Sequence, residues 1–262
     1  MGIWIGDAGK GLLVDGRAAD ERPCQALCSG FGHIYGAFGD RGCCFEDGRK
    51  LFDFALPPGT NTLLPFGGHV CALSSECDCV WAICARDGIA RLSAPAGNYP
   101  RHACISPCGR YLAVAGGAAG EVVMLNRELK CICRYRVAGA AVDVCFLPRA
   151  LAVLCAVGEE KITARLVAIS GRGVTEEMTA CPSAPGRLLA QPGGRLLMGV
   201  YGQVRQLDIR GKTVGCTRCV YPSRMRMTAR GPLFADGWQG GVYTLQGKRI
   251  AACPEPEDFL IT

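Results

Sequence analysis

One strand-turn-strand unit recurs seven times along the 262-residue chain, and this repeat constrains its fold more than any other feature. The clearest copy, residues 106–126 (SPCGRYLAVAGGAAGEVVMLN), has a polar turn, an apolar strand, a glycine-rich turn and a second strand. Similar units occupy residues 2–16, 33–48, 79–93, 151–166, 195–208 and 232–247. No stretch of useful length has the apolar period of a helix. The chain is therefore predicted to be all-β.

The distance between the seven turns indicates which all-β fold is expected. The turns end at Gly11, Gly42, Gly88, Gly120, Lys161, Gly202 and Gly241, which are 31 to 46 residues apart. This is the spacing of propeller blades, and tight hairpin turns favour glycine because it adopts a positive φ without steric cost. We predict one domain over residues 1–262, a seven-bladed β-propeller of four-stranded blades. A β-sandwich is the alternative, and seven units in the same order disfavour it.

The two ends of the chain predict how the ring closes. The first unit begins directly with its buried inner strand, so its blade lacks one strand, while residues 258–262 (DFLIT) form an apolar strand without a partner. We expect the C-terminal strand to pair with the N-terminal strand in one blade. Such pairing closes the ring and removes the free sheet edges that a propeller must avoid.

Composition limits the class of protein. Hydrophobic residues make up 49% of the chain and charged residues 20%, enough apolar surface to form a core. No apolar run reaches the roughly 18 residues that span a membrane, and the first residues lack a basic segment followed by an apolar one. We expect a soluble, non-secreted protein without membrane association. The net charge of +6 is spread along the chain and identifies no partner.

Eighteen cysteines are unusual for a chain large enough to form a core without disulfides. Many alternate with apolar residues, as in 79–84 (CVWAIC), where a thiol packs as a small hydrophobe. We interpret most as reduced core residues in a bacterial cytoplasm. Cys216 and Cys219 have zinc or redox spacing, but a structural zinc needs four ligands and the chain has no second C-x-x-C. We therefore expect no metal and no cofactor, with a role for this pair left open.

Two stretches resemble WD-repeat and related YVTN-type bacterial propellers, namely residues 68–92 and 106–113. The Gly68–His69 pair and the Ser-Pro-x-Gly turn at 106–109 match the family, whereas its closing Trp-Asp dipeptide occurs nowhere in the chain. The chain is thus identified as a degenerate relative. The resemblance implies a ring that presents loops to protein or peptide partners without catalysis, and a hydrogen-bonded histidine at His69 that braces its blade.

The candidate binding residues lie in loops that precede the innermost strands, because these loops surround the mouth of a propeller channel. Residues 99–102 (YPRH) and 221–224 (YPSR) share a Tyr-Pro start followed by basic residues. We expect an exposed basic rim, with an exposed tryptophan in the turn at 236–240 as a further anchor. The candidates are Arg101, His102, Arg224, Arg226 and Trp238. Solvated arginines and a loop-packing Tyr-Pro are the alternative interpretation.

The predicted function is a non-enzymatic, monomeric scaffold that binds a protein, a peptide or a small anionic partner at one face of the ring. The chain has no phosphate loop, no nucleophile elbow and no helical zinc motif, and its basic residues form no nucleic-acid-binding run. A propeller hydrolase or lactonase is the alternative. An enzyme should show carboxylates, histidine or a metal converging in the channel, whereas a binding protein should show a wide face with arginine and aromatic residues.

Overall fold

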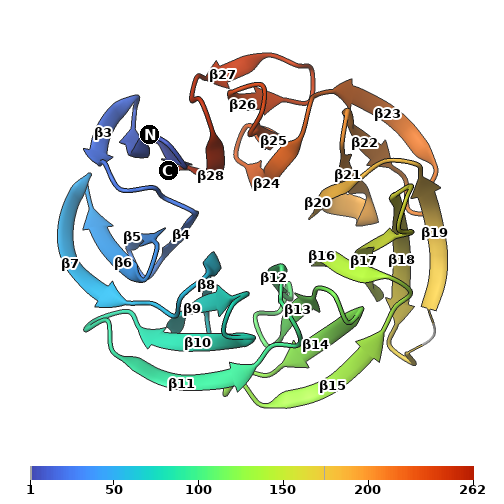
Figure 1. The fold of residues 1–262 in the computed structure, drawn as a ribbon, viewed down its shortest axis with the longest axis horizontal. Coiled ribbons are helices and arrows are strands. Elements are labelled where there is room, and N and C mark those ends of the chain that lie inside the picture. Colours follow the sequence, from blue (N-terminus) through green and yellow to red (C-terminus); the bar gives the residue numbers. More distant parts are fainter. Residues whose placement is uncertain (1, 174) are drawn as a thin grey trace.

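Seven blades surround a central channel in the computed structural model, which describes residues 2–173 and 175–262 (Figure 1). Each blade is a four-stranded antiparallel sheet. The strands at Leu112–Gly116 and Leu196–Val200 are buried at every position, whereas the strand at Ala90–Pro95 is mostly exposed, so the interior strands of a blade are the apolar ones. The predicted all-β, seven-bladed architecture is confirmed.

Blades are numbered along the chain, and their strands are given from the channel outwards. The first blade contains β28 (Pro256–Ile261), β1 (Ile3–Asp7), β2 (Gly11–Val14) and β3 (Arg17–Asp20). The second contains β4 (Ala26–Gly30), β5 (His33–Phe38), β6 (Arg41–Glu46) and β7 (Arg49–Ala55). The third contains β8 (Thr60–Phe66), β9 (His69–Ser74), β10 (Cys79–Cys84) and β11 (Ala90–Pro95). The fourth contains β12 (His102–Ile105), β13 (Leu112–Gly116), β14 (Glu121–Leu125) and β15 (Cys131–Arg136).

The remaining three blades follow the same pattern. The fifth contains β16 (Ala140–Phe146), β17 (Ala150–Val157), β18 (Thr163–Ser170) and β19 (Thr175–Cys181). The sixth contains β20 (Pro185–Ala190), β21 (Leu196–Val200), β22 (Gln203–Leu207) and β23 (Thr213–Arg218), with a short 3-10 turn at Pro192–Gly194. The seventh contains β24 (Pro222–Thr228), β25 (Gly231–Asp236), β26 (Gly241–Thr244) and β27 (Arg249–Ala251).

The C-terminal strand closes the ring as predicted. β28 is the innermost strand of the first blade and pairs antiparallel with β1, with Trp4 opposite Leu260 and Ile5 opposite Phe259. The two ends of the described chain consequently lie side by side in Figure 1. Beyond the ladder, the backbone groups of Gly2 and Thr262 exchange two hydrogen bonds of 3.0 Å.

The repeat was placed correctly in six blades and one strand too late in the third. In the six, the repeated unit corresponds to the second and third strands of the blade, whereas residues 79–93 correspond to β10 and β11, the third and fourth strands. The turn between β9 and β10 has no glycine and instead has Asp78 at a φ of 51°. The glycine at Gly88 marks the next turn outwards, which explains why the interval from Gly42 to Gly88 was the longest of the series.

The core lies between the blades. Seven hydrophobic clusters each join one pair of neighbouring blades, including the first and seventh. Ten of the eighteen cysteines are buried, which confirms their predicted role as core residues, while four are half-buried and four exposed. Burial raises the pKa of core thiols, for example to about 12 for Cys71 and Cys155.

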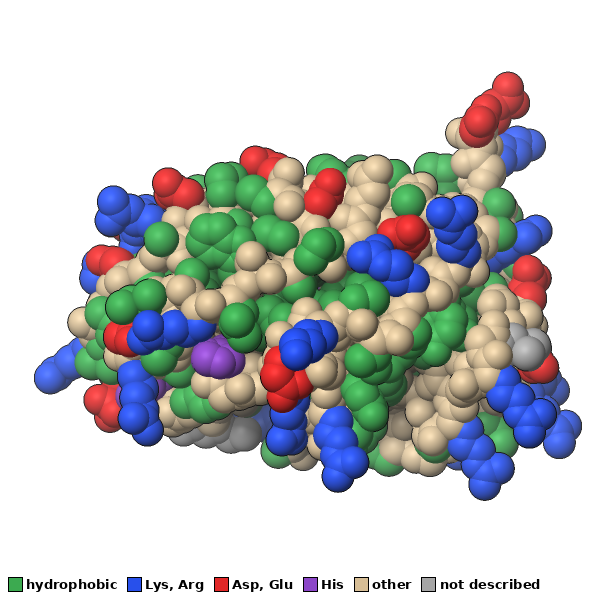
Figure 2. All heavy atoms as spheres, turned by 90° about the horizontal axis from the view of Figure 1, so that it is seen from below, with side chains coloured by type: hydrophobic (Ala, Val, Ile, Leu, Met, Phe, Trp, Pro, Cys, Tyr) green, Lys and Arg blue, Asp and Glu red, His purple; other side chains and the backbone are tan. Residues whose placement is uncertain are grey.

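The outer edge carries charges of both signs. Figure 2 shows the edge formed by the third and fourth blades, where basic and acidic side chains are interspersed among apolar ones. The net charge of +6 is therefore not gathered in one band on this edge. Within the described residues, no helix is long and apolar enough to cross a membrane.

Candidate functional site: the central channel

The innermost strands of the seven blades line the channel, and five of them are irregular near their first residues. Register shifts interrupt β8, β16, β20, β24 and β28. The residues left without a ladder partner include Asn61, Val142, Arg187, Ser223 and Glu257. Bulges of this kind redirect side chains and are common beside functional sites.

A line of polar side chains crosses the channel from the seventh blade to the fifth. The Nη1 of Arg224 lies 2.6 Å from the Nε2 of His102, whose Nδ1 lies 2.5 Å from the Oδ1 of Asp143. A guanidinium only donates hydrogen bonds, so Nε2 must accept, and the ring is neutral with its proton on Nδ1. Burial, together with the nearby Arg224 and Arg187, lowers the pKa of His102 despite the opposing effect of Asp143.

A second carboxylate, Asp258, binds both arginines of β24. Arg226 donates from Nε and Nη2 at 2.9 and 2.8 Å, and the Nε of Arg224 lies 3.3 Å from the same carboxylate. Arg226 also donates to the carbonyl of Leu27 at 2.6 Å. Arg224 is only 5% exposed, and burial lowers its pKa to about 10. We call Arg224, Arg226, His102, Asp143 and Asp258 the channel cluster.

The two carboxylates of the channel cluster have equivalent positions, three blades apart. Asp143 accepts the N–H of Leu188 in the next blade at 2.7 Å, and Asp258 accepts the N–H of Leu27 in the next blade at 2.9 Å. Burial acts to raise the pKa of each, but neighbouring groups outweigh it, so both pKa values lie below the usual value. These groups are His102, Arg187 and the N–H of Leu188 for Asp143, and the two arginines of β24 and the N–H of Leu27 for Asp258. Each carboxylate therefore connects two neighbouring blades.

The channel cluster separates two cavities. One, of about 420 Å³, lies at the face where the inner strands begin, which we call the entry face, and is lined by Asn61, Arg101, Arg187 and Tyr221 with small residues between them. The other, of about 310 Å³, is lined by later residues of the inner strands, mostly apolar, with Arg224 and His102 at its floor. The two cavities are lined by different residues of the inner strands and the loops beside them.

The two arginines of the entry cavity form no ion pair in the described part of the chain, although Arg187 is close enough to Asp143 and Glu257 to act to lower the pKa of both. Arg101 is exposed and its guanidinium lies 4.5 Å from the ring centre of Tyr99. Arg187 donates from Nε to the carbonyl of Ser223 at 2.9 Å. Within residues 2–173 and 175–262, neither side chain has a carboxylate at ion-pair distance. Two cationic groups thus border one cavity of small side chains.

An aromatic pair adjoins this cavity on the entry face. Trp238 is 73% exposed and packs edge-on against Tyr201 of the sixth blade, with ring centres 6.0 Å apart. Asp236 fixes the turn that carries Trp238, because its buried carboxylate accepts the N–H groups of Trp238 at 3.1 Å and Tyr221 at 3.2 Å. Asp236 therefore ties the turn that carries Trp238 to Tyr221, which lines the cavity.

The structure places the predicted residues in two groups. His102, Arg224 and Arg226 belong to the channel cluster, whereas Arg101 and Trp238 lie on the entry face. The expected exposure of Arg224 is wrong. Arg224 follows the register shift at Ser223 and is buried in the channel, where it lies at ion-pair distance from Asp258 and donates a hydrogen bond to His102. Residues 99–101 precede the innermost strand β12, as predicted, whereas only Tyr221 of the second Tyr-Pro segment precedes β24, which begins at Pro222.

Sequence reasoning missed Asp143, Asp258 and Arg187. Each is a charged residue inside an apolar strand run (VDVCF, EDFLI and GRLLA), and a buried charge there requires a partner. The charged residue within each apolar run can be seen in the sequence, but this pattern does not identify its partners, which come from other blades.

Two other predicted features have separate outcomes. His69 begins β9, but its buried Nδ1 has no hydrogen-bond partner among residues 2–173 and 175–262, so the bracing contact implied by the WD-repeat resemblance is not found there. Cys216 is exposed in β23, and Cys219 is buried beyond its end. In the described part of the chain, no group of three or more His, Cys, Asp or Glu is placed to hold a metal.

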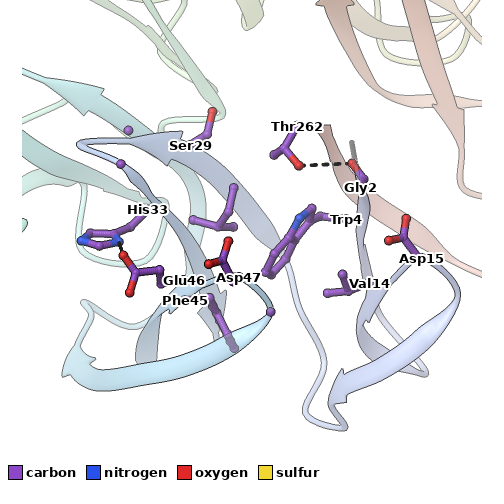
Figure 3. A pocket seen from close by; sticks show the side chains of 14 residues that line it. Gly2, Trp4, Val14, Asp15, Ser29, His33, Phe45, Glu46, Asp47 and Thr262 are labelled. Atoms are coloured by element: carbon purple, nitrogen blue, oxygen red, sulfur yellow. Dashed lines mark hydrogen bonds and ion pairs between the residues drawn. The ribbon is translucent and has the colours of Figure 1, made fainter.

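A third cavity lies outside the channel, between the first and second blades (Figure 3). Its volume is about 560 Å³, and it opens at the exit face, opposite the entry face, beside the junction of the two chain ends. Asp15 and Asp47 come from the turns between the two outermost strands of their blades. His33 lies 3.8 Å from Glu46 at its far side.

No family model matches the sequence, and no curated protein matches it. Solved structures share its fold at low identity. A 6-phosphogluconolactonase-like protein from Bacteroides uniformis has a TM-score of 0.73 at 12% identity, with 99% of this chain and 98% of that chain covered. A functionally unknown protein from Desulfotomaculum acetoxidans has a TM-score of 0.74 at 9% identity, covering 98% and 96%. A catalytically inactive virginiamycin B lyase from Staphylococcus aureus, solved with quinupristin, has a TM-score of 0.69 at 13% identity, covering 88% and 84%.

These similarities show the seven-bladed fold and nothing finer, since all of these identities are below 15%. Membership of the WD-repeat family stays a prediction, because the neighbours are of other propeller kinds.

Proposed function

We propose that the protein is a binding propeller that receives an acidic segment of a protein or peptide at its entry face. The observation that carries the proposal is the pair Arg101 and Arg187, which border one cavity without a carboxylate partner within the described residues. A carboxylate from a partner would form the direct ion pair that neither arginine has within the described residues, and arginine forms strong, oriented hydrogen bonds with carboxylates.

The surface beside the cavity favours a peptide over a small free anion. Trp238 and Tyr201 are exposed side by side and are joined through Asp236 to Tyr221 in the cavity wall. Tryptophan, tyrosine and arginine are the residues most enriched at the energetic centres of protein interfaces. A peptide with an acidic residue in the cavity can place a neighbouring apolar residue on this aromatic pair.

The channel cluster would support this site rather than contact the ligand. The guanidinium of Arg224 already contacts His102 and Asp258. The channel cluster instead joins β24 and β12 across the channel, through the hydrogen bond between Arg224 and His102.

A selection from a random displayed peptide library tests the proposal. Peptides captured by the native protein should be enriched in Asp and Glu, and capture should fall at high salt. The double variant Arg101→Ala, Arg187→Ala should lose capture by 100-fold or more, since each hot-spot arginine is worth about 2 kcal/mol. The control is Arg172→Ala, Arg210→Ala, which removes two arginines from turns on the exit face. Capture of neutral or basic peptides, or capture unaffected by the first pair, would refute the proposal.

A lactonase or hydrolase is the second candidate, and one observation favours it. Glu257 lies in the bulge of β28 and forms no ion pair with the described residues; desolvation raises its pKa, and Arg224 and Arg187 partly counteract this. A carboxyl group with a raised pKa beside arginines is suited to proton transfer. Lactone hydrolysis that is abolished by Glu257→Gln, with unchanged melting, would establish this function in place of peptide binding.

A further inference from the structure

A small polar niche lies at the junction of the two chain ends, within the cavity between the first and second blades. Three polar atoms surround the point where a Cβ on Gly2 would stand: the Oδ2 of Asp15 at 3.5 Å, and the Oγ1 of Thr262 and the Nε1 of Trp4, each at 3.6 Å. Figure 3 shows the indole nitrogen of Trp4 directed toward Gly2 and Thr262. All four residues line the cavity.

The niche leaves hydrogen-bonding groups unused. The side chain of Trp4 is only 5% exposed, and its Nε1–H borders the cavity without an acceptor in the described chain. The Oδ1 of Asp15 accepts the N–H of Ile3 at 2.8 Å, while its Oδ2 has no donor among the same residues. The niche therefore offers one free donor and one free acceptor at a single point.

The rest of the cavity adds acceptors above an apolar floor. Glu46 and Asp47 lie on the other side of Trp4 from Asp15 in Figure 3, and Asp47 forms no ion pair in the described residues. The rings of Trp4 and Phe45, packed edge-on with centres 5.8 Å apart, contribute to the floor. The volume of about 560 Å³ is within the range of small-molecule sites.

The geometry points to a saccharide-binding site, and we propose that this cavity binds a neutral sugar. A hydroxyl group both donates and accepts, so one sugar hydroxyl in the niche can donate to Asp15 and accept from Trp4. The other hydroxyls can donate to Glu46 and Asp47, while the C–H face of the ring covers the aromatic floor. An amine would satisfy the carboxylates but has no acceptor for the Trp4 N–H. The described residues also hold no metal-binding group here.

Saturation-transfer NMR on the full-length protein tests this inference with glucose, galactose, N-acetylglucosamine, maltose and cellobiose, and with putrescine as the amine probe. At least one sugar should show transfer and putrescine should not compete with it. Trp4→Phe keeps an aromatic ring but removes the N–H, and Asp15→Asn replaces the free acceptor with a donor. Each should weaken sugar binding about tenfold, the effect of one hydrogen bond.

Two further variants separate binding from folding. In Gly2→Ala the added methyl group would meet its neighbours only at ordinary contact distances, so melting should be unchanged while the niche is filled and sugar binding is lost. Asp208→Asn is the matched control, because Asp208 occupies the corresponding turn of the sixth blade and should leave binding intact. Transfer to none of the five sugars, displacement by putrescine, or binding that survives Gly2→Ala and Asp15→Asn would each overturn the proposal.

Discussion

Removing the carboxylate of Asp258 should destabilise the ring more than any surface charge does. Asp258 is 1% exposed, and within the described residues it is the only carboxylate at ion-pair distance from Arg224 and Arg226. In Asp258→Ala, both cations lose their counter-charge, and the N–H groups of Leu27 and Phe259 lose their acceptor. Breaking a buried ion pair from one side costs about 3–5 kcal/mol.

For a chain of this size each kcal/mol lowers the melting temperature by about 2–4 °C, so we expect a fall of roughly 6–20 °C. Circular dichroism or calorimetry at neutral pH measures it. Asp208→Ala is the control, since its carboxylate accepts N–H groups of a surface turn, and its effect should be much smaller. If the two variants melt at the same temperature, Asp258 does not hold the blades together and the role assigned to the channel cluster is wrong.

Three further predictions follow from the same structure. Deleting residues 258–262 should lower the melting temperature by many degrees, because the deletion removes most of β28 and exposes Phe259 and Leu260; unchanged melting would contradict closure by this strand. The pKa of His102 is lowered in the folded protein from its ordinary value of about 6.5, so as the pH falls the unfolded chain binds a proton at His102 before the folded protein does. The free energy of unfolding should therefore decline as the pH falls below about 6.5, and His102→Gln should make this decline less steep. Thiol titration in denaturant should approach eighteen, and one equivalent of zinc that is lost together with stability in Cys216→Ser would contradict a metal-free protein.

The fold was predictable because the same local sequence pattern occurs seven times along the chain. Glycine turns and apolar strands identified the blades, and the unpaired strand at 258–262 identified the closure. The exception was the third blade, where the turn before Cys79 adopts a positive φ at Asp78 without glycine. Local turn chemistry can thus shift a predicted strand even when the fold is right.

The candidate site was only partly predictable, since it depends on contacts between residues far apart in the sequence. The Tyr-Pro loops located Arg101 and Arg224, but not which of the two would be buried. Arg224 is buried because Asp258 and His102, from two other blades, meet it in the channel. Exposure of a single arginine is decided by such partners, and no local pattern in the sequence specifies them.

The central claim is that Arg101 and Arg187 receive the carboxylate of an acidic peptide at the entry face. The most direct test follows the side-chain Nε–H signals of the arginines by NMR while the tightest peptide from the library selection is titrated into the native protein. The signals of Arg101 and Arg187 should shift together at one affinity, and those of Arg172 and Arg210 should stay in place. Shifts confined to arginines on the exit face or outer edge, or a bound peptide that leaves Arg101 and Arg187 unchanged, would contradict it.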